Sequence, residues 1–206
     1  SIEEKLKTRK PGHVGKHNFF SVMIPICMAE DGQRLLFEVR ASSLKSQPGD
    51  ICFPGGKIEK DETPLQCALR EFEGETGIPE REAAVLGQFD TLHGFADYTL
   101  YTFVAVIDMK SLEKGKVNPA EVKELFTVPV EFFLKNPPKV YEADIISDVE
   151  NFPYEETGIS PDYNWRKGKN ILPVYHWEDK IIWGMTARIV DWFITVSYTH
   201  LRAHET

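Results

Sequence analysis

Two glutamates four residues apart, Glu71 and Glu75, are the side chains of this sequence best suited to chemistry. In a helix, this spacing places both carboxylates on one face, one turn apart. Unpaired acids so close repel each other unless a cation lies between them, and carboxylate oxygens suit Mg²⁺ or Mn²⁺. A metal held by fixed carboxylates neutralises phosphate charge, while a carboxylate can take a proton from attacking water. The pair therefore predicts metal-dependent hydrolysis of a phosphoanhydride.

The surrounding sequence predicts a helix from about Pro64 to Thr76 that would carry this pair. Thr63 is a good N-cap, Gln66 completes a capping box, and Gly77 suits a left-handed stop. Apolar residues recur at helical spacing on another side of this helix: Leu65, Ala68, Leu69 and Phe72. The helix is therefore expected to pack on a core and to hold the acids rigidly.

Two glycines precede the helix, and the acids around them also have a purely structural explanation. Gly55 and Gly56 permit a close approach of the backbone to a ligand or ion. The alternative is that the acids of this region form only a solvated helix face: Glu59, Glu62, Glu71, Glu73 and Glu75.

The complete pattern favours function. The segment Gly56-x5-Glu62-x7-Arg70-Glu71-Phe72-Glu73-Gly74-Glu75-Thr76-Gly77-Ile78 resembles the Nudix box. That motif reads Gly, five residues, Glu, seven residues, Arg-Glu, an apolar residue, any residue, Glu-Glu, any residue, Gly and an apolar residue, and all but one of its fixed positions are met. The resemblance implies an α+β chain with the Nudix fold, an α/β/α sandwich around a mixed β-sheet.

The same resemblance implies roles for individual residues. Glu71 and Glu75 would be metal ligands, and one of them or a later acid would act as the base. Arg70 would orient the glutamates, and Glu62 would support the site from the loop side. Gly56 would lend its backbone carbonyl to the metal.

Two later residues are weaker candidates. Glu121 is a further possible metal ligand or base from a loop, although a solvated loop acid is at least as consistent with its position. His93 stands alone between Leu92 and Gly94, where a structural role is the more common one.

Gly74 is the departure from the motif, because the family has Glu there, and that Glu commonly helps to hold metal. Glycine also costs ~1 kcal/mol of helix propensity relative to alanine. Glu73 is adjacent but points about 100° away, so it is a poor substitute. This position favours a hypothesis of another class, a nucleotide-binding Nudix domain with impaired catalysis.

An upstream segment narrows the substrate. Leu36-Phe37-Glu38-Val39-Arg40-Ala41-x3-Lys45-x3-Gly49-x3-Phe53-Pro54-Gly55-Gly56 resembles the signature of coenzyme A diphosphatases. Lys45 stands where Arg is usual, and Glu38 replaces the usual Thr. The resemblance implies cleavage of coenzyme A to 3′,5′-ADP and 4′-phosphopantetheine.

The resemblance also indicates how substrate would be bound. Arg40 and Lys45 would meet its phosphates, together with Gly55 and Gly56, although Arg40 is equally explained as a surface charge at a strand end. The alternative substrate is ADP-ribose or another nucleoside diphosphate derivative.

Composition limits the remaining classes. The 206 residues carry a net charge of -8, which disfavours nucleic-acid binding. No apolar run approaches the ~20 residues of a membrane span, and no signal peptide is visible. Three cysteines without a CxxC spacing indicate buried thiols in a reducing compartment, hence a cytoplasmic protein. The oligomeric state is left open.

The expected elements form one domain. Strands are predicted at 19–28, 34–41, 51–53, 84–91, 98–107 and 171–177, with a short helix within 1–12. A surface loop is expected at 148–170, and a last helix is expected to be capped by Thr186. A single Nudix hydrolase domain would span 1–195. Residues 196–206 resemble a translated sequencing adapter, so they are expected to be non-native, with no role for His200 or His204.

Overall fold

The computed structural model describes residues 1–202, with side chains described up to residue 198. Two compact units divide the chain, Ser1–Val128 and the part from Pro129 onward. Compactness does not decide whether two units fold as one domain, so the single domain over 1–195 stays a prediction. His200 and His204 lie outside the described side chains, so their expected lack of a role also stays a prediction.

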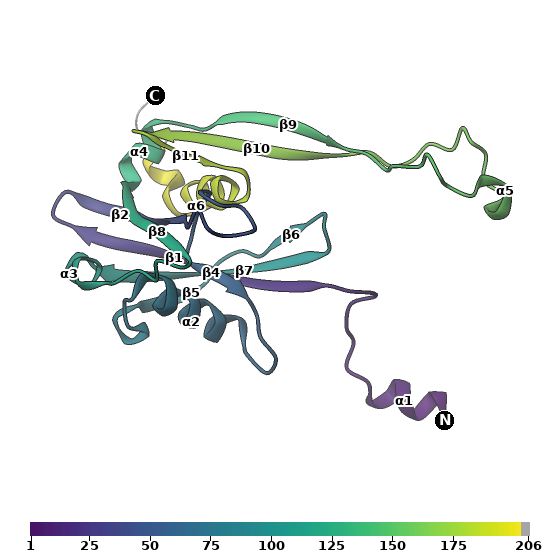
Figure 1. Cartoon of the computed structure of the whole chain (residues 1–206), viewed down its shortest axis with the longest axis horizontal. Coiled ribbons are helices and arrows are strands. Elements are labelled where there is room, and N and C mark those ends of the chain that lie inside the picture. Colours follow the sequence, from purple (N-terminus) through teal and green to yellow (C-terminus); the bar gives the residue numbers. More distant parts are fainter. Residues whose placement is uncertain (203–206) are drawn as a thin grey trace. The chain divides into compact units, whose positions relative to one another are not determined.

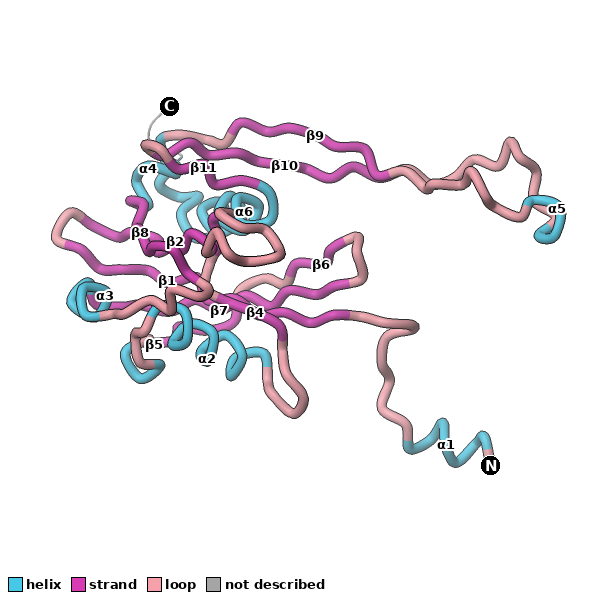
Figure 2. Tube along the Cα trace, in the orientation of Figure 1, coloured by secondary structure: helices cyan, strands magenta, loops and turns pink. Residues whose placement is uncertain are grey.

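The first unit is built on a mixed eight-stranded sheet (Figures 1 and 2). Its main path follows the order β3 (Ile51–Cys52), β2 (Gly32–Arg40), β1 (Asn18–Ala29), β7 (Tyr98–Asp108) and β5 (Ala84–Gln88). β1 and β7 run parallel, whereas β2 pairs antiparallel with both β1 and β3, and β5 pairs antiparallel with β7. The strands predicted at 19–28, 34–41 and 98–107 are therefore confirmed within two residues at each end.

Three short strands complete this sheet. β4 (Gly55–Lys57) pairs with β1, β6 (Leu92–Gly94) pairs with β7, and β8 (Val122–Pro129) pairs with β2. β4 is important for the site because it places Gly55 and Gly56 beside Val22 and Ser21 of the central strand. The sequence did not predict it, because a three-residue strand beginning with two glycines has no periodicity to detect.

Helix α2 (Pro64–Thr76) packs on one face of this sheet and begins and ends where the sequence predicted. The Thr63 hydroxyl accepts from the Gln66 amide at 3.3 Å, and the Gln66 side chain accepts from the Thr63 amide at 2.9 Å. Gly77 closes the helix with a φ of 69°. The apolar face of α2 joins β-strand side chains in one buried cluster that includes Phe72, Leu36 and Met23.

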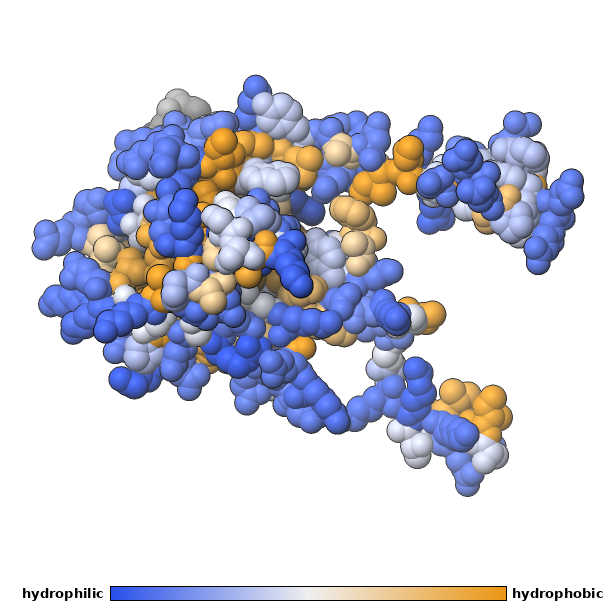
Figure 3. Space-filling model, in the orientation of Figure 1, coloured by the Kyte–Doolittle hydropathy of each residue, from blue (hydrophilic) through white to orange (hydrophobic). Residues whose placement is uncertain are grey.

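Smaller helices surround this core. α3 (Met109–Lys114) follows β7, and a 3-10 turn, η1 (Glu80–Glu82), follows α2. α1 (Ile2–Thr8) confirms the short helix expected near the start, but it stands away from the sheet (Figure 1). Its apolar Ile2 and Leu6 are 78% and 65% exposed, and the helix shows an apolar patch in Figure 3.

The second unit contains an antiparallel sheet with the order β11 (Lys180–Trp183), β10 (Gly168–Trp177) and β9 (Lys139–Ile145). α6 (Gly184–Arg202) contacts β10, β11 and α4 (Val130–Lys135). α5 (Tyr154–Thr157) lies at the far end of the β9–β10 hairpin (Figure 1).

Two expectations for this unit were wrong in detail. Residues 148–170 are not wholly loop, because they contain α5 and the start of β10. The last helix begins at Gly184 rather than after Thr186, because the left-handed Gly184 turns the chain directly out of β11.

The α+β class with a mixed sheet and flanking helices is confirmed. Within the part of the chain that the structure describes, no helix is both long and apolar enough to span a bilayer.

Candidate active site

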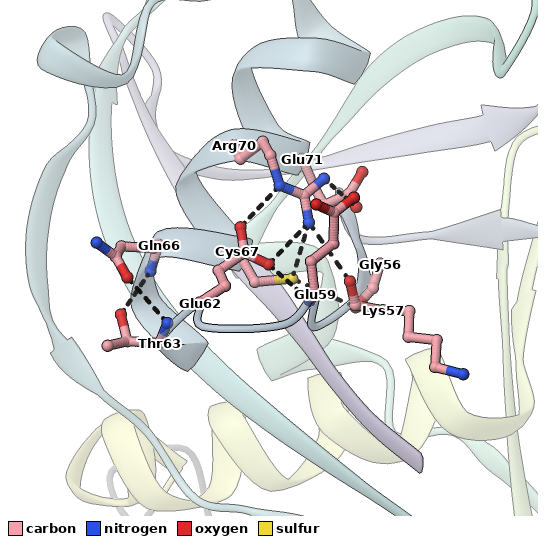
Figure 4. Close-up of polar contacts among 9 residues, drawn as sticks. All are labelled: Gly56, Lys57, Glu59, Glu62, Thr63, Gln66, Cys67, Arg70 and Glu71. Atoms are coloured by element: carbon pink, nitrogen blue, oxygen red, sulfur yellow. Dashed lines mark hydrogen bonds and ion pairs between the residues drawn. The ribbon is translucent and has the colours of Figure 1, made fainter.

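Arg70 is the centre of a polar network at the start of α2 (Figure 4). Its guanidinium donates to both oxygens of Glu62, from Nε at 2.7 Å and from Nη2 at 3.0 Å. Nη1 donates to Glu71 Oε1 at 2.6 Å. These bonds from Arg70 hold the pKa of Glu62 at about 2, well below its usual range. Arg70 therefore links Glu62 of the loop before the helix to Glu71 of the helix itself. Its role in orienting the glutamates for catalysis stays a prediction.

Gly56 allows Glu71 to lie directly against β4. A side chain at position 56 would begin 2.3 Å from Glu71 Oε1, a distance that no real Cβ contact allows. The Gly56 carbonyl accepts from the Cys67 thiol at 3.6 Å. Gly56 thus leaves room for a carboxylate of this chain, and the close approach to a ligand or ion that we expected of it stays a prediction.

Glu75 is the buried member of the predicted pair and is 5% exposed. Its Oε2 accepts from the Gly55 amide at 2.9 Å, so Gly55 and Gly56 contact one helical acid each. Burial, and then the charge of Glu38, raise the pKa of Glu75 well above the usual range of a carboxyl. The two acids of α2 thus lie in different environments, because the Glu71 side chain is 21% exposed and pairs with Arg70.

Glu38 is the residue of this region that the sequence analysis did not assign to the site. It lies on β2, is 1% exposed, and accepts from the Cys52 thiol at 3.2 Å. Burial raises its pKa, and the Cys52 hydrogen bond and the Arg40 charge offset part of that rise. The sequence did contain a signal for Glu38, because it replaces the usual Thr of the coenzyme A diphosphatase signature. We interpreted that difference as a mismatch to the signature and not as a functional residue.

The other predicted residues border this group to different degrees. Glu121 lies beside the end of β2, because the Ala41 amide donates to its carbonyl at 2.8 Å, and its charge adds to the raised pKa of Glu38 and Glu75. Arg40 donates to the Ser46 carbonyl at 3.3 Å and keeps a buried Nε without a partner.

Lys45 and His93 show no comparable relation to the acids. Lys45 is exposed on the loop that joins β2 to β3. His93 lies on β6, with its Nδ1 3.1 Å from the Thr99 hydroxyl, which suits the structural role considered for it.

The donor set suits a hard divalent cation, since it combines carboxylate oxygens with backbone carbonyls. Glu38 Oε2 is buried without a hydrogen-bond partner, which leaves a carboxylate oxygen uncompensated. Among the side chains of residues 1–198, no group of three or more His, Cys, Asp or Glu is already arranged to hold a metal ion. Arg70 holds Glu71, and the Gly55 amide holds Glu75.

Comparison with known proteins identifies the family of this chain. Residues 18–149 match the NUDIX domain, and the chain belongs to the NUDIX family. It is 33% identical over 138 residues to the peroxisomal coenzyme A diphosphatase NUDT7 of Mus musculus. The aligned region covers 66% of this chain and 56% of that protein. The chain therefore spans little more than half the length of this relative.

Two further similarities extend over more of the chain. It is 31% identical over 173 residues to the uncharacterized Nudix hydrolase NudL of Photorhabdus laumondii. The aligned region covers 82% of this chain and 80% of that protein. The solved structure of a MutT/nudix family protein from Enterococcus faecalis covers 96% of this chain and 70% of its own, with a TM-score of 0.52 and 15% identity. The structural similarity supports the fold alone.

The two glycines of β4 give a matched pair of predictions. In Gly56→Ala, the three atoms nearest to the new Cβ all belong to the Glu71 side chain, so we expect a loss of activity of at least about tenfold with little change in melting temperature. In Gly55→Ala, the Cβ meets the backbone of β1 at 2.4 Å from Ser21 O, so we expect a clear loss of stability. Thermal unfolding and steady-state kinetics of both variants check this, and equal effects on stability would contradict it.

Proposed function

We propose that this chain is a metal-dependent phosphoanhydride hydrolase that cleaves coenzyme A, or a derivative of it, to 3′,5′-ADP and 4′-phosphopantetheine. The observation that carries the proposal is the rigid pair of acids on α2, with Glu71 fixed by Arg70 and Glu75 fixed by the Gly55 amide. The mouse relative named as a coenzyme A diphosphatase supports this substrate class.

The reaction is a displacement at phosphorus. Water adds to one phosphorus of the pyrophosphate and the bridging P–O bond breaks. Each product keeps one of the two pyrophosphate phosphates as a monoester, and the 3′-phosphate stays on the ADP product. The proton of the water passes to a carboxylate of the site, for which Glu71, Glu75 and Glu121 are the candidates. A bound Mg²⁺ or Mn²⁺ would neutralise phosphate charge and make water a better nucleophile.

Individual residues of this chain would hold the cation or position its ligands. Glu71 and Glu75, with the Gly56 carbonyl and Glu121, are the residues that would hold the cation. Arg70 and Glu62 keep Glu71 in place through the two-pronged ion pair between them.

Substrate recognition is assigned to the loop between β2 and β3 and to the glycines of β4. Arg40 ends β2 and Lys45 is exposed on the loop that follows, and their charges would meet the phosphates of the substrate. Gly55 and Gly56 each contact one acid of α2, so a pyrophosphate held at these acids would lie beside the backbone of both glycines. We also place the protein in the cytoplasm, consistent with its three free cysteines.

The direct test is cleavage of coenzyme A by metal-free protein supplied with Mg²⁺ or Mn²⁺, with products identified by mass and ADP-ribose run in parallel. We expect release of 3′,5′-ADP that stops when a chelator is added and returns when metal is restored. Faster cleavage of ADP-ribose would overturn the substrate assignment. Tight metal-dependent binding without product would favour the binding-only alternative, for which Gly74 is the specific observation.

A further inference from the structure

Glu38 and Glu75 are the only buried carboxylates among the residues that the structure describes. Their exposed fractions are 1% and 5%, whereas Glu71 keeps contact with solvent and pairs with Arg70. Burying one carboxylate is costly, and burying two beside each other is more so, because they repel in a medium that screens poorly. Such a pair requires a compensating charge or a shared proton.

The topology brings the two side chains to the same place. Leu36 and Phe72 belong to one buried cluster between β2 and α2. Glu38 follows Leu36 by two positions on a strand, so it lies on the same face of the sheet. Glu75 follows Phe72 by about one turn of α2, on the side of the helix that faces this sheet.

A single short segment holds one oxygen of each carboxylate. The Cys52 thiol, at the end of β3, donates to Glu38 Oε1 at 3.2 Å. Three residues later, the Gly55 amide donates to Glu75 Oε2 at 2.9 Å. The second oxygen of Glu38, Oε2, is buried and has no hydrogen-bond partner. Because buried carboxylate oxygens are normally satisfied, that atom needs either a proton shared with Glu75, whose side-chain hydrogen bond lowers the pKa of Glu38, or a cation.

The charged residues nearby do not neutralise the two buried carboxylates. Arg40 is the cation whose charge acts on Glu38, while Glu121 and Glu75 add negative charge around it. Gly74, for its part, leaves α2 with one carboxylate fewer than the Nudix pattern has. An acidic, desolvated group with an unpartnered oxygen is the chemistry of a site for a hard divalent cation.

We propose that Glu38 is an additional carboxylate ligand of the divalent cation, reaching it from β2, opposite Glu75 of α2. The proposal rests on the metal dependence of the proposed function but not on its substrate. It takes this further acid from the sheet, whereas the Nudix motif has a further acid on the helix at position 74. The competing explanation is that Glu38 is a protonated side chain that only fills the core.

The test is Mn²⁺ binding to the metal-free protein without substrate, followed by the electron paramagnetic resonance signal of free Mn²⁺ and by thermal unfolding. We expect Glu38→Gln to raise the Kd for Mn²⁺ by at least about tenfold. The melting temperature without metal should stay equal or rise, because a buried repulsion is removed. The stabilisation that Mn²⁺ gives to the wild type should shrink in parallel.

Matched variants separate a ligand from a core filler. Glu73→Gln removes an exposed acid of α2 that hydrogen-bonds the Glu80 amide and not Glu38 or Glu75. It should keep the Mn²⁺ Kd within about threefold of wild type. If Glu38→Gln fails to unfold cooperatively, Glu38→Thr replaces it, with the same expected loss of affinity.

A Kd within twofold of wild type in a folded Glu38 variant would overturn the proposal, as would an equal loss in Glu73→Gln. This readout involves no coenzyme A. Failure to cleave that substrate would therefore reject the proposed function while leaving the role of Glu38 to be decided by metal affinity.

Discussion

Glu75→Gln should lower kcat for phosphoanhydride cleavage by at least about a thousandfold, because it removes a charged metal ligand and candidate base from the centre of the site. The fold should survive, since glutamine keeps a side-chain oxygen that can accept from the Gly55 amide. It also relieves the repulsion from Glu38 that raises the pKa of the native side chain. Without metal at neutral pH, we therefore expect a melting temperature equal to that of wild type or higher.

Glu73→Gln is the matched control for this prediction. Glu73 lies on the same helix but is exposed, and its carboxylate accepts from the Glu80 amide at 2.8 Å, beyond the end of the helix. Its substitution should leave kcat within about twofold of wild type. Steady-state kinetics at saturating metal and thermal unfolding of both variants measure the two expected effects. Near-normal turnover in Glu75→Gln would refute the assignment of this acid to the reaction.

Gly74→Glu should raise activity, most strongly when metal is limiting, because it adds a carboxylate to the acidic end of α2. A Cβ at position 74 would meet no atom within 4 Å, so the new side chain can be accommodated without displacing its neighbours. An additional carboxylate ligand should lower the concentration of Mg²⁺ required for half-maximal rate by at least about tenfold. Titration of the rate with Mg²⁺ gives this value directly.

Gly74→Ala and Gly74→Gln separate charge from helix propensity. Alanine should stabilise the protein by about 1 kcal/mol and leave the metal requirement unchanged, because glycine is a poor residue within a helix. Glutamine adds the same length as glutamate without its charge. An equal gain in all three variants would show that helix stability, rather than a ligand, limits the rate.

The helix and its motif were predictable because they depend on local sequence. The capping box at Thr63 and Gln66 and the stop at Gly77 fix both ends of α2 through contacts between near neighbours. The contacts of Arg70 with Glu62 and Glu71 also span short distances in the chain, and the motif spacing anticipated them. This part of the candidate site could therefore be derived before any coordinates.

What could not be predicted depends on strand pairing. Glu38 joins the site because β2 pairs with β3, so that Cys52 lies opposite Glu38. No pattern in the sequence specifies that register, and an isolated acid in an apolar strand has no motif. β9 was missed for a related reason, because its alternation is weak and most of its side chains are exposed.

The parallel pairing at the centre of the first sheet has a kinetic consequence. Asn18 of β1 lies opposite Tyr98 of β7, so the contact closes a loop of 98 − 18 = 80 positions that contains all of α2. Closing such a loop costs about 4 kcal/mol of chain entropy, and pairings so distant in sequence slow folding. During synthesis, α2 and its acids emerge before the strand that completes the sheet beneath them. Until β7 follows, the apolar stripe of that helix has no finished surface to cover it, and this interval is when the nascent chain is most open to aggregation.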